Sequence, residues 1–282
     1  MIIVRELYFQ YEKKPILQNL NFKVYQGEVL GILGPSGAGK STLQKILTGV
    51  IRNYKGSVII NNQEIRNVRN SFYQNIGVDF EFPTLFDKLT ARQNLKYFIS
   101  LYQTDQCGIN DLLNKVGLLK DADRKVCEFS KGMKSRLNFI KALLHNPQFI
   151  FLDEPLSGLD PTNAKIMKNI IIEEKKKGKT IILTTHNMAD ATELCTRVAF
   201  IVDGSIKALD TPHNLIMQVG ATQITYTWEE NGIELSNCCD ISDTGANKQL
   251  HELLKANRLT SIHSSEPTLN DIFIKVTGRT LL

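Results

Sequence analysis

The sequence predicts an α/β fold with a mostly parallel sheet that carries helices on its faces. Three mostly apolar runs, at residues 29–33, 149–153 and 180–185, have the length and composition of strands that are buried on both faces. Stretches with apolar residues at helical spacing separate these runs along the chain. Such alternation is typical of parallel sheets, because the connection between two parallel strands is usually a helix.

Length and composition are those of a protein with a substantial core. The chain has 282 residues, of which 42% are hydrophobic and 22% are charged, so disorder and a fibrous repeat are excluded. Residues 217–282 hold 5 Lys/Arg and 8 Asp/Glu, a net charge of −3 within a total of +5, which leaves +8 for residues 1–216. The mildly basic charge of residues 1–216 suits the binding of phosphorylated ligands or of an anionic membrane surface. It is far from the charge of a nucleic-acid-binding segment, so we expect no nucleic acid as a partner.

The sequence predicts a soluble, cytoplasmic protein. The longest stretch without charge, residues 211–228, contains Pro212, His213 and several other polar side chains that lipid would leave unsatisfied. The N-terminus lacks the basic and then apolar layout of a signal peptide. Five cysteines show no metal-ligand spacing, so we interpret them as reduced structural thiols: Cys107, Cys127, Cys195, Cys238 and Cys239.

The first elements predict an antiparallel β subdomain. Hydrophobic and polar residues alternate over residues 2–9 and again over 22–24. The turn residue Pro15 separates the two stretches, and Gly27 follows the second. Further on, a helical insert is expected at about residues 82–145. Within it, Thr90 and Gln93 make a capping box that opens one helix, and a second helix begins near Ser130.

The chain is expected to contain two domains. After residue 216 the composition turns acidic, with a strand expected at 223–228 and a polar helix around 248–257. We therefore predict a large domain at 1–216 and a small accessory C-terminal domain at 217–282.

A glycine-rich turn with the spacing G-x-x-x-x-G-K-[ST] follows the first apolar run and precedes a helical pattern. Its glycines let backbone N–H groups surround phosphates, where a helix N-terminus adds partial positive charge. We expect Lys40 to bind the β- and γ-phosphates of a nucleotide and the Ser41 hydroxyl to bind Mg²⁺. The core is therefore predicted to be a P-loop NTPase. Its predicted nucleotide-binding residues are Gly34, Pro35, Ser36, Gly37, Ala38, Gly39, Lys40, Ser41 and Thr42.

The second and third apolar runs end in candidate catalytic residues. Asp153 is the last residue of the second run and Glu154 follows it, and we assign Asp153 as a metal ligand and Glu154 as the base for an attacking water. His186 follows the third run, at the edge where parallel α/β sheets place their ligand contacts. Without the phosphate loop, a carboxylate pair or a histidine at a strand end would more often be a solvated terminus.

Five motifs together resemble the ATP-binding subunit of an ABC transporter. They are GPSGAGKST at 34–42, FSKGMKSRL at 129–137, FIFLDEP at 149–155, SGLDP at 157–161 and TTH at 184–186. The resemblance covers about residues 1–216, in the family's order and spacing. Five motifs in agreement distinguish this family from other NTPases, which a lone phosphate loop would not do.

The resemblance implies a head-to-tail dimer with ATP at its interface. Each ATP would lie between Lys40 of one subunit and the signature segment of the other, which here comprises Ser130, Lys131, Gly132 and Met133. The resemblance also implies that Asp160 belongs to a loop that crosses between subunits. Tyr11 stands where the family has an aromatic residue that stacks on adenine, with Tyr8 and Phe9 as close alternatives.

Two motifs depart from the family pattern. The signature usually reads L-S-G-G-Q, whereas this chain has Phe129, Lys131 and Met133 in it and keeps Ser130 and Gly132. The larger departure is Glu81, which stands where many members carry a glutamine that touches magnesium and water and faces the membrane subunit. Similar glutamates occur in antibiotic-export and peptide-immunity members. We therefore count Glu81 as a candidate metal-site residue and leave open that it points into solvent.

The function implied is that of an ATPase subunit that drives export through a separate membrane permease. The tail at 266–279 is similar to that of drug and antibiotic exporters, although an amphipathic helix ending at Gly278 explains it equally well. An aromatic-rich segment at 72–102 is either a permease-docking surface or core. A soluble ABC-type ATPase acting on nucleic acid or ribosomes, and an importer ATPase, are the alternatives. The expected location is the inner face of the cell membrane, through a permease and beside a second ATP-binding subunit.

Overall fold

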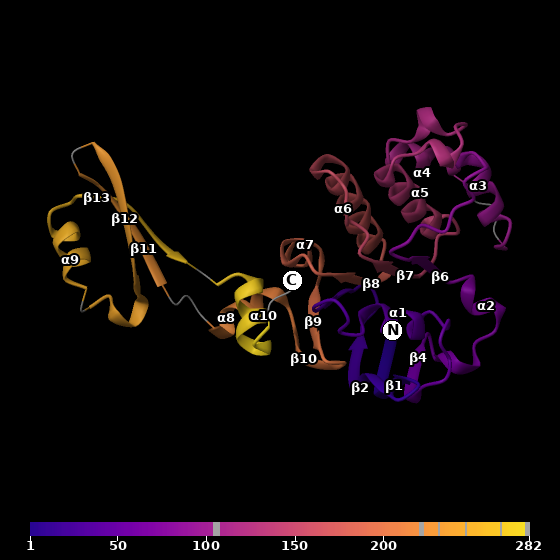
Figure 1. Cartoon of the computed structure of the whole chain (residues 1–282), viewed down its shortest axis with the longest axis horizontal. Helices are drawn as coiled ribbons and strands as arrows, with labels where there is room; N and C mark the ends of the chain where they lie inside the picture. The colour runs from indigo at the N-terminus through magenta and orange to yellow at the C-terminus, as the bar shows by residue number, and fades with distance from the viewer. Residues whose placement is uncertain (104–107, 220–222, 231, 246, 266, 280–282) are drawn as a thin grey trace. The chain divides into compact units, whose positions relative to one another are not determined.

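The computed structural model describes residues 1–103, 108–219, 223–230, 232–245, 247–265 and 267–279. The chain divides into two units, of which the first ends at Leu209 and the second begins at Asp210 (Figure 1). The sequence places this division at 216/217 instead. The earlier division follows from packing, because the helix that begins at Pro212 packs against the last helix of the chain.

A six-stranded sheet with the strand order β10-β9-β3-β8-β7-β6 forms the centre of the first unit. The pairs β3–β8, β7–β8, β3–β9 and β6–β7 are parallel, which confirms the predicted mostly parallel sheet. The three apolar runs are neighbouring strands, and every residue in them is buried. The strands are β3 (Val29–Leu33), β6 (Ile76–Asp79), β7 (Phe149–Asp153), β8 (Thr180–Thr185), β9 (Arg197–Val202) and β10 (Ser205–Asp210).

A second, antiparallel sheet confirms the predicted β subdomain. Its strand order is β2-β1-β4-β5, and Ile2 of β1 pairs with Val24 of β2. Helix α1 (Lys40–Leu47) contributes Leu43 and Ile46 to a core that also takes side chains from both sheets, so α1 is enclosed between them. The strands are β1 (Ile2–Tyr11), β2 (Lys14–Val24), β4 (Lys55–Ile60) and β5 (Gln63–Glu64).

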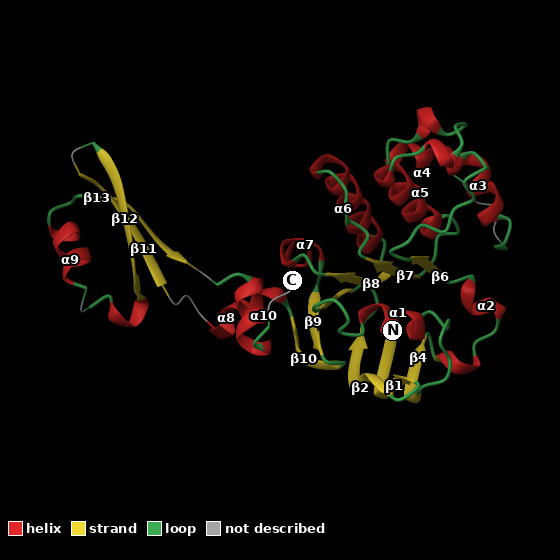
Figure 2. Cartoon of the chain, viewed as in Figure 1, coloured by secondary structure: helices red, strands yellow, loops and turns green. Residues whose placement is uncertain are grey.

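The remaining helices of the first unit lie mostly between β6 and β9 along the chain (Figure 2). The capping box at Thr90 is present, with the Gln93 N–H donating to Thr90 Oγ1 at 3.1 Å and the Thr90 N–H donating to Gln93 Oε1 at 2.9 Å. Ser130 is the N-cap of α5, as expected. The helices are α2 (Asn70–Tyr73), α3 (Ala91–Ile99), α4 (Ile109–Lys115), α5 (Lys131–Leu143), α6 (Pro161–Lys176) and α7 (Met188–Leu194).

The second unit contains a small antiparallel sheet with β11 at its centre. Tyr226 and Trp228 of β11 pack against Leu250 and Leu253 of α9 and form a separate small core. The last helix has a capping box at Thr268 and ends at Gly278, whose φ of 66° is left-handed. The elements are α8 (Pro212–Val219), β11 (Gln223–Glu230), β12 (Ile233–Asp240), α9 (Lys248–Lys255), β13 (Leu259–Ser265) and α10 (Leu269–Thr277).

Cys127, Cys195, Cys238 and Cys239 are free thiols, and Cys107 lies outside the described residues. Within the described ranges no helix combines the length and the apolar character needed to cross a membrane.

His145, which follows α5, is a buried imidazole in the first unit. Its ring stacks on Tyr102 with 3.7 Å between centroids, and Nε2 lies 2.8 Å from the carbonyl oxygen of Ile76. Because a carbonyl can only accept, Nε2 carries the proton, and Nδ1 has no hydrogen-bond partner within the described part of the chain. Burial, helped by the nearby charge of Lys179 and opposed by the hydrogen bond to Ile76, lowers the pKa of His145 to about 4.

We expect acid to destabilise the first unit through His145. The pKa falls from 6.5 to about 4 on folding, so the neutral ring stabilises the fold above pH 6.5 and this contribution is lost as the pH falls towards 4. Between about pH 7.5 and about pH 5 the loss is about 2 kcal/mol. His145→Gln keeps a donor for Ile76 but does not titrate, so urea unfolding should show a weaker pH dependence for this variant. Equal pH dependence in both proteins would contradict the assignment.

Candidate active site

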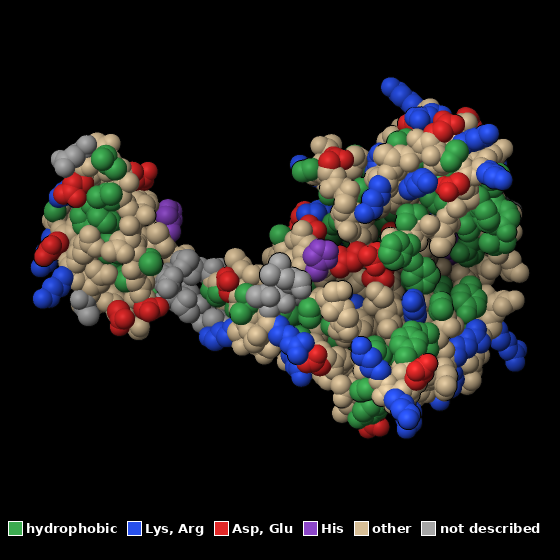
Figure 3. Space-filling view, in the orientation of Figure 1, with side chains coloured by type: hydrophobic (Ala, Val, Ile, Leu, Met, Phe, Trp, Pro, Cys, Tyr) green, Lys and Arg blue, Asp and Glu red, His purple; other side chains and the backbone are tan. Residues whose placement is uncertain are grey.

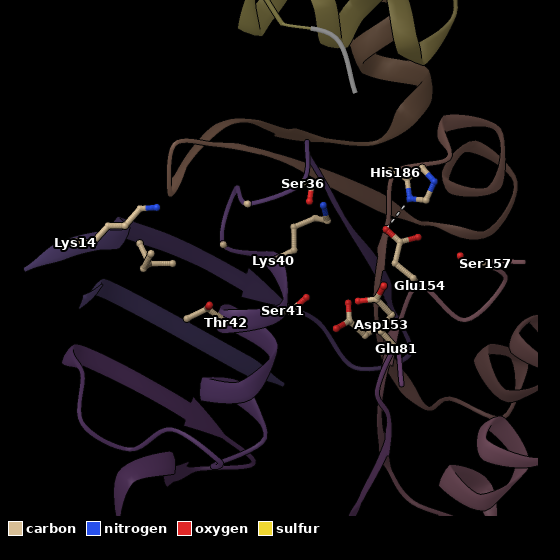
Figure 4. Close-up of a pocket in the computed structure, with 13 residues that line it drawn as sticks. Lys14, Ser36, Lys40, Ser41, Thr42, Glu81, Asp153, Glu154, Ser157 and His186 are labelled. Atoms are coloured by element: carbon tan, nitrogen blue, oxygen red, sulfur yellow. Dashed lines mark hydrogen bonds and ion pairs between the residues drawn. The ribbon is translucent and has the colours of Figure 1, made fainter. Parts of the chain in front are cut away.

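A cavity of about 540 Å³ lies where the loop after β3 faces the ends of β7 and β8 (Figure 4). In a parallel sheet these strand ends share one edge, which is where ligands of α/β proteins bind. The predicted catalytic and phosphate-binding residues are therefore brought together from three strands. The lining residues are Lys14, Ile16, Ser36, Gly37, Gly39, Lys40, Ser41, Thr42, Glu81, Asp153, Glu154, Ser157 and His186.

The phosphate loop has a backbone that only glycine permits at two points. A Cβ on Gly34 would lie 2.1 Å from the carbonyl oxygen of Ile201 in β9, so a side chain there would push the loop off the sheet. Gly39 is the N-cap of α1 with φ of 103°, a conformation that other residues rarely adopt. The loop thus directs the N-terminus of α1 at the cavity. Pro35 and Ala38 belong to this loop without lining the cavity.

Lys40 extends into the middle of the cavity (Figure 4). Its Nζ donates to the carbonyl oxygens of Gly34 at 2.6 Å and Pro35 at 3.1 Å. Burial lowers the pKa of Lys40, and three carboxylates oppose that shift: Glu154, Asp153 and Glu81. A cation held by carbonyl oxygens at a helix N-terminus is suited to bind a phosphate.

Thr184 of β8 holds both acidic residues at the end of β7. Its hydroxyl donates to the buried carboxylate of Asp153 and accepts from the backbone N–H of Glu154 at 3.3 Å. The carbonyl oxygen of Thr184 accepts from the same N–H at 3.1 Å. Glu154 has φ of 51°, which is unusual outside glycine and is characteristic of functional sites. The two hydrogen bonds that the Glu154 N–H donates to Thr184 fix the backbone at Glu154 and direct its side chain at the cavity.

Glu154 and His186 form a hydrogen-bonded pair across the ends of β7 and β8. His186 Nδ1 lies 2.9 Å from Glu154 Oε1, and the histidine is mostly exposed whereas the glutamate side chain is mostly buried. In such a pair the glutamate carboxylate can act as a general base, and the histidine orients it. Figure 4 shows both side chains on the side of the cavity that faces Lys40.

Oxygen ligands for a cation also meet in this cavity. The Ser41 hydroxyl and the carboxylates of Asp153 and Glu81 line it. Within the described ranges no three His, Cys, Asp or Glu side chains are close enough to hold a metal ion by themselves. The hydroxyl and the two carboxylates in the cavity are oxygen groups of the kind that bind Mg²⁺, which usually takes one or two protein oxygens and completes its shell with phosphate and water.

Several residues predicted for the site lie outside this cavity. Tyr11 is 47% exposed and packs edge-on against Phe9 with 4.7 Å between ring centroids. Asp160 caps α6 by accepting from the N–H groups of Thr162 and Asn163, both at 3.1 Å. A hydrogen bond from the Asn163 side-chain amide, together with these backbone bonds, lowers the pKa of Asp160.

The signature segment begins α5 and lies beside the loop that precedes α6. Ser130 Oγ accepts from the Met133 N–H at 3.2 Å, so Ser130 is the helix N-cap. A Cβ on Gly132 would lie 3.5 Å from Leu159, and the end of the Lys131 side chain lies beside Gly158. None of these four signature residues lines the cavity of their own chain.

Three lining residues were not identified from the sequence. Ser157 lies within the recognised SGLDP motif, so attention to that motif's first residue could have found it. Lys14 and Ile16 are on the same face of β2 and reach the cavity only because the β1–β2 hairpin packs beside the phosphate loop. No local pattern in the sequence indicates that contact.

Comparison with known proteins gives consistent similarities. The sequence profile described as "ABC transporter" matches residues 17–157. A fluoroquinolones export ATP-binding protein of Mycobacterium tuberculosis is 43% identical over 285 residues, covering 100% of this chain and 94% of that protein. The lantibiotic transport ATP-binding protein SrtF of Streptococcus pyogenes is 37% identical over 220 residues, covering 76% of this chain and 94% of that protein.

Solved structures show the same fold. An ATP-binding subunit of an ABC transporter superposes with a TM-score of 0.72 at 28% identity, covering 78% of this chain and 93% of that chain. A dimeric bacterial ABC transporter cassette has a TM-score of 0.68 at 25% identity, covering 75% of this chain and 98% of that chain.

Thr184→Val tests whether the Thr184 hydroxyl supports the site. Valine keeps the shape but leaves Asp153 without its donor, so we expect the free energy of unfolding to fall by about 1–3 kcal/mol. Thr180→Val on the same strand is a matched control, because the buried Thr180 hydroxyl has no hydrogen-bond partner within the described ranges. Urea unfolding should show the control unchanged or stabilised. Equal losses in both variants would show that the Thr184 bonds do not contribute.

Proposed function

The chain belongs to the ABC transporter family, and we propose that it is the ATPase subunit of an exporter. In this role its hydrolysis of ATP drives transport through a separate permease. The observation that carries the proposal is one cavity in which Lys40 and Ser41 face Asp153, Glu154 and His186. The names of the relatives with high identity describe export or transport ATP-binding proteins, which favours export over import. They likewise do not favour a soluble ATPase acting on nucleic acid or ribosomes.

ATP binds with its phosphates in the loop between β3 and α1. Backbone N–H groups of the loop and the N-terminus of α1 neutralise phosphate charge, and Lys40 exchanges its two carbonyl contacts for phosphate oxygens. Thr42 lines the same cavity. Tyr11, which is exposed at the end of β1, is the proposed stacking partner of adenine.

Glu154 is the proposed general base for hydrolysis. The Glu154 carboxylate takes a proton from the water that attacks the γ-phosphate, and His186 fixes the carboxylate through its 2.9 Å hydrogen bond. Positioning and charge stabilisation supply most of the catalysis in phosphoryl transfer, so a fixed base beside a fixed lysine is what the reaction requires.

Mg²⁺ is the proposed cofactor, with Ser41, Asp153 and Glu81 as the oxygen groups that hold it. When bound, it supplies positive charge that offsets the charge of the phosphates. Thr184 keeps the Asp153 carboxylate in place for this role by donating a hydrogen bond to it.

A second copy or a related ATP-binding subunit completes the site. Ser130, Lys131, Gly132 and Met133 lie at the N-terminus of α5, where the N–H groups and the helix dipole favour an anion. These residues do not line their own cavity, so we propose that they contact ATP held by the partner subunit. Asp160, at the start of α6, lies in the proposed crossing loop.

The permease is proposed to dock on an exposed, mostly aromatic surface formed by the rings of Phe82, Phe86 and Tyr97 and the aliphatic side chain of Leu101, which we call the aromatic surface. Figure 3 shows hydrophobic side chains gathered beside α3. Phe86 packs edge-on against Tyr97 with 5.0 Å between ring centroids, so the patch is an ordered surface. Phe72 from the same sequence segment is instead buried in the core. Docking of the permease would hold the protein at the cytoplasmic face of the membrane.

We propose that residues 1–209 form the ATP-binding domain and that the second unit is accessory. All residues that line the cavity lie between Lys14 and His186. A chain that ends after Leu209 should therefore bind ATP with an affinity within about threefold of the full chain, as measured by calorimetry. A truncated protein that is folded by circular dichroism but no longer binds ATP would contradict this division.

Glu154→Gln tests the proposed base. Because the amide cannot take the proton, we expect ATP hydrolysis to fall by about 100-fold or more while ATP binding is retained. Size-exclusion chromatography should show a dimer that accumulates with ATP. Glu6→Gln, at an exposed position outside the cavity, is the control and should hydrolyse ATP at the normal rate. Normal turnover in Glu154→Gln would exclude Glu154 as the base.

A further inference from the structure

The segment between β6 and α3 connects the cavity with the aromatic surface. Glu81 in this segment lines the cavity, and the next residue, Phe82, is 77% exposed. Residues 80–86 form neither helix nor strand, so the sheet ladder does not hold them in place. Side-chain contacts must therefore set where Glu81 lies.

Asn138 of α5 binds this segment on both sides of Glu81 and Phe82. Its Nδ2 donates to the carbonyl oxygen of Phe80 at 3.3 Å, and its Oδ1 accepts from the Thr84 N–H at 3.3 Å. Lys141, one turn further along α5, donates to the same Oδ1 at 2.7 Å. The Thr84 N–H and the Lys141 ammonium both donate to Oδ1, and they fix the orientation of the amide because only its oxygen can accept.

Asp79 completes the arrangement from the end of β6. Nδ2 of Asn138 donates to Asp79 Oδ1, so the amide bridges a carboxylate and an ammonium and uses all four of its hydrogen-bonding positions. Asn138 and Asp79 are 1% and 4% exposed. Hydrogen bonds shielded from water in this way are costly to lose, so the amide is a rigid support.

Lys141 adds a second attachment to the same segment. Its Nζ donates to Thr84 Oγ1 at 2.7 Å and to the Thr84 carbonyl oxygen at 3.3 Å. It also lies 4.7 Å from the centroid of the Phe98 ring in α3. Asn138 and Lys141 therefore attach the segment to α5, the helix whose first turn is the signature segment.

We propose that Asn138, supported by Asp79 and Lys141, is a positioning residue that holds Glu81 at the ATP site. The inference rests on the proposed function, since Glu81 acts on hydrolysis only if the cavity binds ATP. Asn138 does not line the cavity, so we expect its effect on turnover to pass through the segment that carries Glu81.

A double-mutant cycle on the full chain separates this role from simple stabilisation. In the wild-type background, Asn138→Ser should lower kcat by about tenfold, while KM for ATP stays within about threefold because the Lys40 loop is untouched. In a Glu81→Ala background the same substitution should lower kcat by less than about twofold, because the residue being positioned is gone. Lys141→Met, at a less buried position, should repeat the pattern more weakly and serves if Asn138→Ser does not fold.

Asn94→Ser is the matched control. Asn94 is also a fully buried asparagine that anchors this region, because its Oδ1 accepts from the Phe86 N–H at 2.8 Å and its Nδ2 donates to the Phe86 carbonyl oxygen at 3.0 Å. The Asn94 side-chain hydrogen bonds go to Phe86, Leu89 and Thr90 and not to residues 79–84, so Asn94→Ser should leave the kcat of the isolated subunit within about twofold.

Two results would overturn the inference. One is an equal loss of kcat from Asn138→Ser with and without Glu81, and the other is an equal loss from Asn94→Ser. A wild-type chain without ATPase activity would instead refute the proposed function and the inference together.

Discussion

The site depends on the parallel register of three buried strands. β3, β7 and β8 are neighbours, and their pairing sets Leu33 beside Thr185 and Asp153 beside Thr184. One edge of the sheet thereby receives the phosphate loop, the acidic pair and the histidine at once. A shift of one residue in β7 would reverse which face each side chain occupies and would separate Asp153 from Thr184. The apolar residues that bury these strands are therefore also what determines the geometry of the site.

The sequence was sufficient for features that depend on local chemistry. The bounds of β3, β7 and β8 follow from mostly apolar runs, and the N-caps at Thr90 and Ser130 follow from side chains that bind the first turn of a helix. Contacts between distant segments could not be predicted in this way. Lys14 reaches the cavity through the packing of a hairpin, and the division after Leu209 depends on two helices that are about 50 residues apart in the chain.

The signature segment illustrates why one chain shows only part of an ATP site. Ser130 satisfies its own helix N-terminus, and Gly132 packs near Leu159, so both residues have a structural role within the chain. A helix N-terminus nevertheless favours an anion, and the signature residues do not line the cavity of their own chain. In the dimer that we propose, the signature segment of a second subunit would contact the bound ATP, and the similarity to a dimeric cassette supports this proposal.

Charge explains why a glutamate in the cavity needs a rigid support. Three carboxylates face the cavity, those of Glu81, Asp153 and Glu154, against the two ammonium groups of Lys14 and Lys40. Because carboxylates outnumber ammonium groups, this lining does not favour the binding of a polyanion by itself. It suits a triphosphate that binds together with a divalent cation. A glutamate at position 81 strengthens that requirement, since it can hold the cation or its waters but repels the phosphates. The balance depends on where the carboxylate lies, which is why the Asn138 amide, with its bonds on both sides of Glu81, fits a chain that has an acid at this position.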